Sequence, residues 1–385
     1  MTDLHAPAEP VGHAATETHE YLRAAYRRAR QAGATRHRDI AEQLGISEGA
    51  LIAVHGGLHA GTPHSTPGLR ARRLRAEWPR LLASLEAAGE VMALTRNASC
   101  VHEKVGVYRG ASASGPPGRE TGLVLGADID LRVFYSRWAH GFAVDEPGTQ
   151  GVQRSLQFFD AAGQAVHKVF ARPATDLQAW ATLAQHFLAD DQTPGMTPEI
   201  GPEPATEPAT ERPDAAIDQA SLRQAWAAMR DTHDFFGLLK RHGVTRTQAL
   251  RLAEARFVQA VDSSSAHQAL AAAATAGTPV MVFVGNPGMI QIHTGPVHKV
   301  AVMGPWLNVL DPSFNLHLRE DHIASAWVVR KPTSDGLVTS LELFDAQGDT
   351  IAMLFGERKP GRTELCAWRA IIDSLLDERA GLELA

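Results

Sequence analysis

The chain contains a long internal repeat. The nine residues from Ser155 to Gly163 (SLQFFDAAG) match those from Ser340 to Gly348 (SLELFDAQG) at an offset of 185 positions (340 − 155). At the same offset, residues 131–170 align with residues 316–355 without a gap. Two copies at such a long period are not the pattern of a solenoid. The repeat therefore predicts a duplicated domain, and 385 residues suffice for two or three domains.

The repeat extends upstream of the gap-free match, where Asn97 pairs with Asn286. A proline-rich stretch then separates the two copies. Residues 191–214 contain six prolines and almost no bulky apolar side chain. Such a segment cannot bury a core and predicts an extended or disordered linker. We expect an N-terminal repeat over 1–190, a linker over 191–214 and a C-terminal repeat over 215–385.

The hydrophobic pattern of the C-terminal copy predicts helices, then strands, then a helix. Residues 221–240 show apolar side chains at helical spacing, and Thr245 could cap a second helix over 245–255. An amphipathic helix is expected over 364–376. Between these helices, eight strands are expected over 280–284, 289–293, 299–303, 306–310, 315–318, 326–330, 338–344 and 350–355. Strands joined by short turns pair antiparallel, so the fold class is α+β, each half a large antiparallel meander with flanking helices.

Charge and composition exclude several classes of protein. The chain has 37 basic and 43 acidic residues, a net charge of −6, whereas nucleic-acid-binding proteins usually carry a basic excess. Two cysteines, Cys100 and Cys366, are too few for a disulfide framework or a cysteine-ligated zinc site. Residues 1–15 contain no apolar run, and no long apolar stretch occurs elsewhere. We therefore expect no signal peptide, no membrane insertion, no nucleic-acid partner and a cytoplasmic location.

The common catalytic signatures are absent. The sequence contains no Walker loop, no Gly-x-Gly-x-x-Gly after a strand, no His-Glu-x-x-His and no nucleophile elbow, so no directly bound nucleotide cofactor is expected. Residues 38–48 (RDIAEQLGISE) do resemble the first helices of a helix-turn-helix, with Gly45 at the turn and Ser47 as a cap. A DNA-binding regulator is therefore a remote alternative, and a helical packing unit is the simpler interpretation.

One histidine has neighbours that suit a flat, iron-bearing ligand. His233 falls within the helix expected over 221–240, and positive charge from Lys240, Arg241 and Arg246 lies toward one end. A ligating nitrogen, an apolar surface and nearby cations suit the iron, the macrocycle and the propionates of haem. A histidine that fills a helix–helix contact remains the alternative. The helical neighbours of His233 at −7, −4, +3 and +4 are Trp226, Met229, Phe236 and Gly237.

Further polar residues fall on the expected strands. In the first half, His102 follows Asn97 on a strand, and Arg132 occupies the position that matches His317 in the second copy. Arg132 either lies on a solvated sheet face or points at an anion. In the second half, polar positions that could line a site or face solvent are Asn286, Gln291, His293, His298 and His317.

Several longer motifs resemble a known family. They are residues 92–97 (MALTRN), 100–106 (CVHEKVG), 231–233 (DTH), 286–288 (NPG), 291–295 (QIHTG), 304–308 (GPWLN) and 327–336 (WVVRKPTSDG). Together they resemble the cytoplasmic haemin-degrading and haem-trafficking proteins of the HmuS/HemS/ChuS type. The resemblance implies a structural duplication that agrees with the internal repeat. It also implies haem as substrate or cargo, an inner-membrane haem importer as a partner and an external electron donor.

The resemblance assigns roles to individual residues. His233, in the Asp-Thr-His motif, matches the proximal iron ligand, and Arg132 matches a distal arginine, which makes these two the candidate catalytic residues. Phe134 lies two residues beyond Arg132 on the same strand face. His102 matches a first-half histidine suggested as a second haem contact. The remaining matches are Arg246 near the propionates, Arg358 after the last strand and Phe355 at a pocket position that is often Tyr.

The sequence leaves two functions open for the same pocket. The first is an enzyme that binds haem and degrades it, in the manner of a haem oxygenase, and so releases iron. The second is a non-catalytic carrier that accepts haem from an importer and passes it on. Arg132 could hold an axial ligand by a charge-assisted hydrogen bond in either case.

Overall fold

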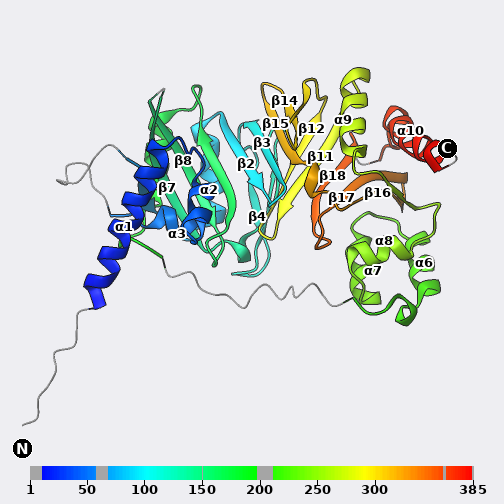
Figure 1. The fold of residues 1–385 in the computed structure, drawn as a ribbon, viewed down its shortest axis with the longest axis horizontal. Coiled ribbons are helices and arrows are strands. Elements are labelled where there is room, and N and C mark those ends of the chain that lie inside the picture. Colours follow the sequence, from blue (N-terminus) through cyan, green and yellow to red (C-terminus); the bar gives the residue numbers. More distant parts are fainter. Residues whose placement is uncertain (1–10, 58–67, 150, 197–210, 359–360, 384–385) are drawn as a thin grey trace, which may run out of the picture.

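The computed structural model describes residues 11–57, 68–149, 151–196, 211–358 and 361–383. Within these ranges, two antiparallel sheets of nine strands each dominate the fold, with helices around them (Figure 1). The expected fold class is therefore confirmed. We call the sheet that begins with β1 sheet 1 and the sheet that begins with β10 sheet 2.

The two sheets have equivalent strand orders. Sheet 1 runs β1-β7-β8-β9-β2-β3-β15-β14-β13, and sheet 2 runs β10-β16-β17-β18-β11-β12-β6-β5-β4. The strands of the first half are β1 (Arg70–Arg73), β2 (Val91–Arg96), β3 (Cys100–Gly106), β4 (Ser112–Ser114), β5 (Thr121–Leu125), β6 (Asp130–Phe134), β7 (His140–Gly148), β8 (Gly151–Phe159) and β9 (Ala165–Ala171). Those of the second half are β10 (Val258–Val261), β11 (Val280–Asn286), β12 (Met289–Gly295), β13 (Val300–Met303), β14 (Trp306–Leu310), β15 (Phe314–Arg319), β16 (Ser325–Thr333), β17 (Gly336–Phe344) and β18 (Thr350–Gly356).

Each sheet takes six strands from one half and three from the other. In sheet 1, β15 of the second half pairs with β3, with His102 opposite Leu316. In sheet 2, β6 of the first half pairs with β12, with Arg132 opposite Ile290. The eight strands expected in the second half are all present, but this exchange was not foreseen. Period-2 alternation indicates which side chains share a face, and it carries no information about which distant strand lies alongside.

Helices flank both sheets (Figure 1). In the first half these are α1 (Val11–Gln31), α2 (His37–Gln43), α3 (Glu48–Ala53), α4 (Trp78–Ser84), η1 (Leu85–Ala88), η2 (Tyr135–Arg137) and α5 (Leu177–His186). The remaining ones are η3 (Asp214–Ala216), α6 (Gln219–Ala227), α7 (Asp234–His242), α8 (Arg246–Leu252), α9 (Ser265–Ala276), η4 (Glu320–His322) and α10 (Cys366–Glu383). The helices α1–α3 pack on the β1/β7/β8 end of sheet 1, and α6–α8 pack on the β10/β16/β17 end of sheet 2.

The main core lies between the sheets and under the flanking helices. One cluster joins inner residues of sheet 2 to α9, α10 and the exchanged strands β14 and β15. A second joins inner residues of sheet 1 to α4, α5 and the exchanged strands β5 and β6. Alternation in the strands produces this arrangement: in β11, Val280, Val282 and Val284 are buried, whereas Met281 and Phe283 are half-buried on the opposite face.

The single helix expected over 221–240 is wrong, because the chain forms α6 and α7 with a break between them. Two aspartates stabilise the break. One carboxylate oxygen of Asp234 accepts hydrogen bonds from the backbone N–H groups of Arg230 and Asp231, each at 3.0 Å. Asp231 accepts one from the backbone N–H of His233 at 2.8 Å. Side-chain bonds of this kind offer the backbone an alternative to helix, which apolar spacing alone does not reveal.

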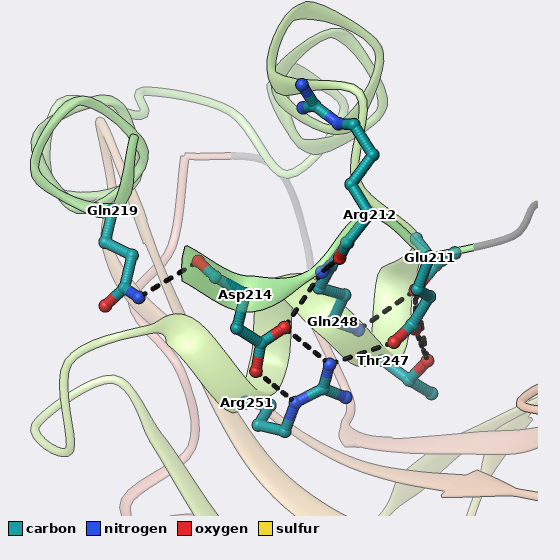
Figure 2. Close-up of polar contacts among 8 residues, drawn as sticks. Glu211, Arg212, Asp214, Gln219, Thr247, Gln248 and Arg251 are labelled. Carbon is teal, nitrogen blue, oxygen red and sulfur yellow. Dashed lines mark hydrogen bonds and ion pairs between the residues drawn. The ribbon is translucent and has the colours of Figure 1, made fainter. Parts of the chain in front are cut away.

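Both described ends of the expected linker are held by hydrogen bonds. Arg251 of α8 donates to Asp214 at 2.8 and 2.9 Å and to Glu211 at 2.9 Å, and Gln248 donates to Asp214 at 2.9 Å (Figure 2). At the other end, Arg73 donates to the carbonyl of Gly195 at 2.6 Å. The structure assigns no helix or strand to residues 191–196 and 211–213, and residues 197–210 lie outside the described ranges, so the linker stays a prediction.

Candidate functional site

Sheet 2 has one face that the helices cover only in part. The register places Phe355 opposite Met281, Met353 opposite Phe283, and Arg132 opposite Ile290. Directly opposite residues lie on the same face. All six are half-buried, and the rings of Phe283 and Phe355 lie 5.0 Å apart. We call this surface the open face, formed by Met281, Phe283, Ile290, Met353, Phe355, Arg132 and Phe134.

The open face brings together residues from both halves of the chain. Arg132 and Phe134 come from β6 of the first half, and Phe355 comes from β18 of the second. Three strand spacings separate β18 from β6, which is about 14 Å and close to the width of a porphyrin. Arg132 donates hydrogen bonds to Asp130 and to the carbonyl of Leu131, and 35% of its side chain is exposed. The structure thus places Arg132, Phe134 and Phe355 on one surface.

Helices α6–α8 form a wall beside the open face. They pack on Trp327 and Val329 of β16, which lie on the same face of sheet 2 as Met353 and Phe355 according to the register. Trp226 anchors α6 by donating from its indole nitrogen to the carbonyl of Arg330 at 3.1 Å. The wall therefore borders the apolar surface on the side from which His233 comes.

His233 is the most exposed member of the predicted site. It lies at the N-cap of α7 rather than inside a helix, and 89% of its side chain is exposed. Its Nδ1 lies 2.6 Å from Oδ1 of Asp231, so a neutral ring with the proton on Nδ1 leaves Nε2 free as a metal ligand. The backbone N–H and then the ring of His233 lower the pKa of Asp231 below its usual value. The alternative of a histidine that fills a helix–helix contact is wrong.

The neighbours of His233 divide between core and surface. Trp226 and Met229 are buried, so the expectation that they share the face of His233 is wrong. Phe236 and Gly237, three and four residues further on, do lie on the His233 side of α7. Phe236 is 65% exposed, and a side chain at Gly237 would meet no atom within 4 Å. A flat apolar ligand could therefore approach this side of α7.

Two of the predicted cations lie near this end of sheet 2. Arg358 follows β18 by two residues, pairs with Asp335 at 3.7 Å and contributes to the lowered pKa of Asp231. Arg246 begins α8, and its Nε donates to Glu342 at 2.8 Å. Both guanidinium groups retain some exposure, 24% for Arg358 and 16% for Arg246. Both could meet an anionic group bound beside α7.

The structure does not bring His102 to the open face. His102 lies on the inner face of sheet 1 with no exposed surface, and its ring centre lies 5.0 Å from that of Phe314. Neither ring nitrogen has a hydrogen-bond partner among the described residues. Burial holds the pKa of His102 well below its usual value, and the nearby His293 and Lys104 add to this effect. A contact between His102 and haem would require the two sheets to separate.

The helix-turn-helix resemblance has a structural explanation without DNA. Gly45 adopts a φ of +66°, and the Ser47 hydroxyl caps α3 by accepting from the backbone N–H of Ala50 at 3.2 Å, as predicted. However, α3 is buried, and Glu48 accepts from Lys168 on β9 at 2.5 Å. A recognition helix must present a free face to the major groove, so the regulator interpretation of this segment is wrong.

Sequence reasoning missed several residues of the site. Met281, Phe283 and Met353 form the apolar surface, and their alternation with buried valines could have revealed them. Asp231, two residues before His233, was visible in the motif but was given no role. Of the other polar candidates, Gln291 and His293 are buried between the sheets, and His317 lies on sheet 1, where its Nδ1 is 2.6 Å from Asn308 Oδ1.

Two further observations limit the kind of site. Among the residues that the structure describes, no three His, Cys, Asp or Glu side chains converge in a way that could hold a free metal ion. A metal bound through His233 would therefore need most of its ligands from the molecule that carries it. In the same part of the chain, none of the helices combines the length and the apolar character required to span a bilayer.

The fold and the site define a class: a duplicated antiparallel β-protein whose two halves share strands, with an apolar open face beside an exposed, carboxylate-oriented histidine. Comparison with known proteins narrows the class. The sequence model of the haemin-degrading HemS/ChuX domain matches this chain twice, over residues 45–187 and 243–375. The chain belongs to this family.

Full-length relatives support the assignment. The chain is 41% identical over 342 residues to the hemin transport protein HmuS of Yersinia pestis, covering 89% of this chain and 93% of HmuS. Among solved structures, the haem-bound form of PhuS, a heme-binding protein from Pseudomonas aeruginosa, has a TM-score of 0.86 at 45% identity, covering 93% of this chain and 99% of PhuS. The heme-degrading enzyme ChuS of Escherichia coli O157:H7 has a TM-score of 0.80 at 38% identity, covering 93% and 99%.

Proposed function

We propose that this protein binds haem between the open face of sheet 2 and α7, with His233 as the iron ligand. The observation that carries the proposal is the exposed imidazole of His233, whose Nδ1 is held by Asp231 at 2.6 Å. A histidine oriented by a carboxylate through one nitrogen is the usual arrangement of a metal-ligating imidazole. The names of HmuS and of haem-bound PhuS support haem as the ligand.

The surroundings of His233 suit the rest of the haem molecule. Phe236 and Gly237 offer an exposed apolar surface with room for a macrocycle. The open face supplies further apolar contacts from Phe283 and Phe355. Arg246 and Arg358 are the proposed partners of the propionates, since arginine forms strong charge-assisted hydrogen bonds with carboxylates. His102 has no part in this site.

The proposed reaction is oxidative opening of the bound haem, with release of its iron. Membership of the haemin-degrading family and the similarity to ChuS, a heme-degrading enzyme, support degradation. The macrocycle and its iron supply the oxidative chemistry. His233 would hold the iron, and the guanidinium of Arg132 would donate hydrogen bonds to the oxygen group that reacts with the haem. Dioxygen would be the oxidant, and the electrons that activate it would come from an external donor, as the family resemblance implies.

A non-catalytic carrier is the second candidate. The transport names of the Yersinia relatives favour it. In this role the same pocket would accept haem from an inner-membrane importer and pass it to an acceptor. For both functions we propose a cytoplasmic location. We also propose repeats over 1–190 and 215–385 with a linker over 191–214, and the two matches of the family model support these two repeats.

Reduction of the bound haem separates the two functions. The haemin complex is mixed with a reductant in air, with catalase present to remove free peroxide and a chelator present to capture iron. Decay of the Soret band to a ring-opened tetrapyrrole, with stoichiometric iron in the chelator, is the result expected for the enzyme. A Soret band that persists under these conditions, with intact haem passed to an apo-haem protein, would establish the carrier instead.

A further inference from the structure

An aspartate lies beside Arg132 on the same strand. Asp130 begins β6, and because side chains alternate along a strand, Asp130 and Arg132 share one face of sheet 2. Nη1 of Arg132 donates to Oδ1 of Asp130, and the same nitrogen donates to the carbonyl of Leu131 at 3.2 Å. Nε and Nη2 donate to no other described residue. One end of the guanidinium is therefore held, and the other end is free.

The neighbouring strands offer Arg132 no alternative partner. In the part of the chain that the structure describes, no other carboxylate lies within ion-pair distance of Arg132. The residues directly opposite Asp130 and Arg132 on β5 and β12 are all apolar: Leu123, Leu125, Ile290 and Ile292. Without the carboxylate of Asp130, no side chain opposite this pair could accept from the guanidinium.

The internal repeat shows that the fold does not require this ion pair. At the offset of 185, Asp130 and Arg132 correspond to Asn315 and His317 on β15. Burial lowers the pKa of His317, so both of these residues are uncharged at neutral pH. Nevertheless β15 pairs with β3 as β6 pairs with β12. The pair of Asp130 and Arg132 is therefore particular to the face on which haem is proposed to bind.

We propose that Asp130 is a positioning residue for Arg132: it holds the guanidinium by Nη1, so that Nε and Nη2 stay available to a small ligand of the haem iron. The inference rests on the proposed haem site. The arrangement parallels that of His233, where Asp231, also two residues earlier, holds Nδ1 and leaves Nε2 free. A guanidinium that is already held loses less conformational entropy when it donates to a ligand. Asp130 acts through Arg132 and does not touch the ligand.

Two uncharged replacements separate the position of Arg132 from the charge beside it. Asp130→Asn and Asp130→Ala both remove the negative charge of the carboxylate. Asparagine keeps a side-chain oxygen that can accept from Nη1, whereas alanine has no acceptor in its side chain. A difference between the two variants therefore reports the hold on the guanidinium, because the change in charge is the same in both.

The test compares two ligands of the ferric haemin complex of the full chain. Fluoride accepts hydrogen bonds from Arg132, and imidazole tests access to the iron, so the ratio of their affinities isolates the contribution of the guanidinium. Both are titrated by absorbance at one fixed pH near neutrality. Asp130→Asn and Asp130→Ala are each made with and without Arg132→Ala. The matched controls are Asp321→Asn and Asp321→Ala, which alter another aspartate two residues from an arginine, Arg319, on sheet 1.

The fluoride-to-imidazole ratio of Asp130→Ala should lie roughly threefold to tenfold below that of Asp130→Asn, because ordering one long side chain costs a free energy of this order. With Arg132→Ala present, the two replacements should give equal ratios. The two Asp321 variants should both behave as the wild type. Circular dichroism confirms that each variant is folded, and Asp130→Val, which also lacks an acceptor and suits a strand, replaces Asp130→Ala if that variant does not fold.

Equal ratios for Asp130→Asn and Asp130→Ala, or the same difference between them without Arg132, would overturn the inference while leaving haem binding intact. Failure of the wild type to bind haemin would overturn the proposed function and this inference with it.

Discussion

Asn97 and Asn286 occupy equivalent positions in the two halves, and each side chain bonds to the backbone of the other half. Asn97 donates to the carbonyls of Gly285 at 3.1 Å and Ile351 at 2.8 Å. Asn286 donates to the carbonyls of Arg96 at 2.9 Å and Val166 at 2.8 Å. The acceptors are themselves equivalent under the repeat. These reciprocal bonds tie each sheet to the other at the turns β2–β3 and β11–β12.

Loss of either asparagine should therefore destabilise the whole protein. Asn97→Ala leaves two backbone carbonyls without a donor, and we expect a loss of about 1–3 kcal/mol in the free energy of unfolding. Urea denaturation followed by circular dichroism measures it. Asn315→Ala, at a half-buried position on β15, is the control and should change the midpoint little. Equal midpoints for Asn97→Ala and the wild type would show that the bonds do not hold the sheets together.

Asp231→Asn tests the orientation of the proposed iron ligand. The change removes the carboxylate that holds Nδ1 of His233 and keeps a side-chain oxygen that can accept from the backbone. Haemin affinity should fall roughly tenfold, because loss of a group that orients a metal ligand has that order of effect. Asp321→Asn, which alters an exposed pair with Arg319 on sheet 1, should leave affinity unchanged. Equal affinity for Asp231→Asn and the wild type would remove Asp231 from the site.

Arg132→Ala tests the distal assignment. Arg132 lies across the open face from α7, so most of the haemin affinity should remain, within roughly threefold, since the iron ligand and the proposed propionate partners are intact. Reductant-driven decay of the Soret band should slow roughly a hundredfold, because a hydrogen-bond donor on the reacting side would be lost. Arg132→Lys, which keeps the charge, should recover part of the rate. Wild-type turnover together with a wild-type ferric spectrum in Arg132→Ala would contradict the assignment.

Because three histidines are buried, we expect the free energy of unfolding to fall in mild acid. Burial lowers the pKa of both His167 and His293 to about 3, and that of His102 lies well below its usual value. These groups are neutral in the folded state and take up protons in the unfolded state below about pH 6.5. Each buried histidine should therefore lower the free energy of unfolding by roughly 1.4 kcal/mol per pH unit as the pH falls from 6.5 toward 3.

Urea midpoints at pH 7.5, 6.0 and 5.0 measure this effect. Buried carboxylates with lowered pKa values, such as Glu342, titrate well below pH 5. Glu364, whose pKa burial raises, changes the stability in the opposite direction to the three histidines. The midpoint should be highest at pH 7.5 and fall at each step. A midpoint that stays constant from pH 7.5 to 5.0 would contradict the neutral state of the three rings.

Much of the fold was predictable from local patterns, whereas the exchange of strands was not. The match of 155–163 to 340–348 fixes the duplication, and alternation such as that of β11 places each strand. The pairing of β6 with β12 depends on contacts between segments about 160 residues apart, which no local pattern encodes. For the same reason, Arg132 could be assigned to a strand face, and the residues that share that face could not be named.

The candidate site shows a similar division. His233 was found through its motif, and its helical context was wrong because Asp231 and Asp234 end the helix through side-chain bonds. His102 matched a motif equally well, yet it lies in the closed interior. A sequence motif identifies the residue, but the packing of the two sheets decides whether its side chain is exposed. Exposure is what separates these two histidines.

A haemin titration of the wild type, His233→Ala and His298→Ala is the most direct test of His233 as the iron ligand. His298 is an exposed histidine on the connection between β12 and β13, so its loss controls for non-specific haem binding to surface imidazole. We expect one saturable site in the wild type and in His298→Ala, with the same Soret maximum. His233→Ala should bind at least roughly tenfold more weakly, with a shifted Soret band. Equal affinity and an unchanged Soret maximum in His233→Ala would contradict the assignment of His233 as the iron ligand.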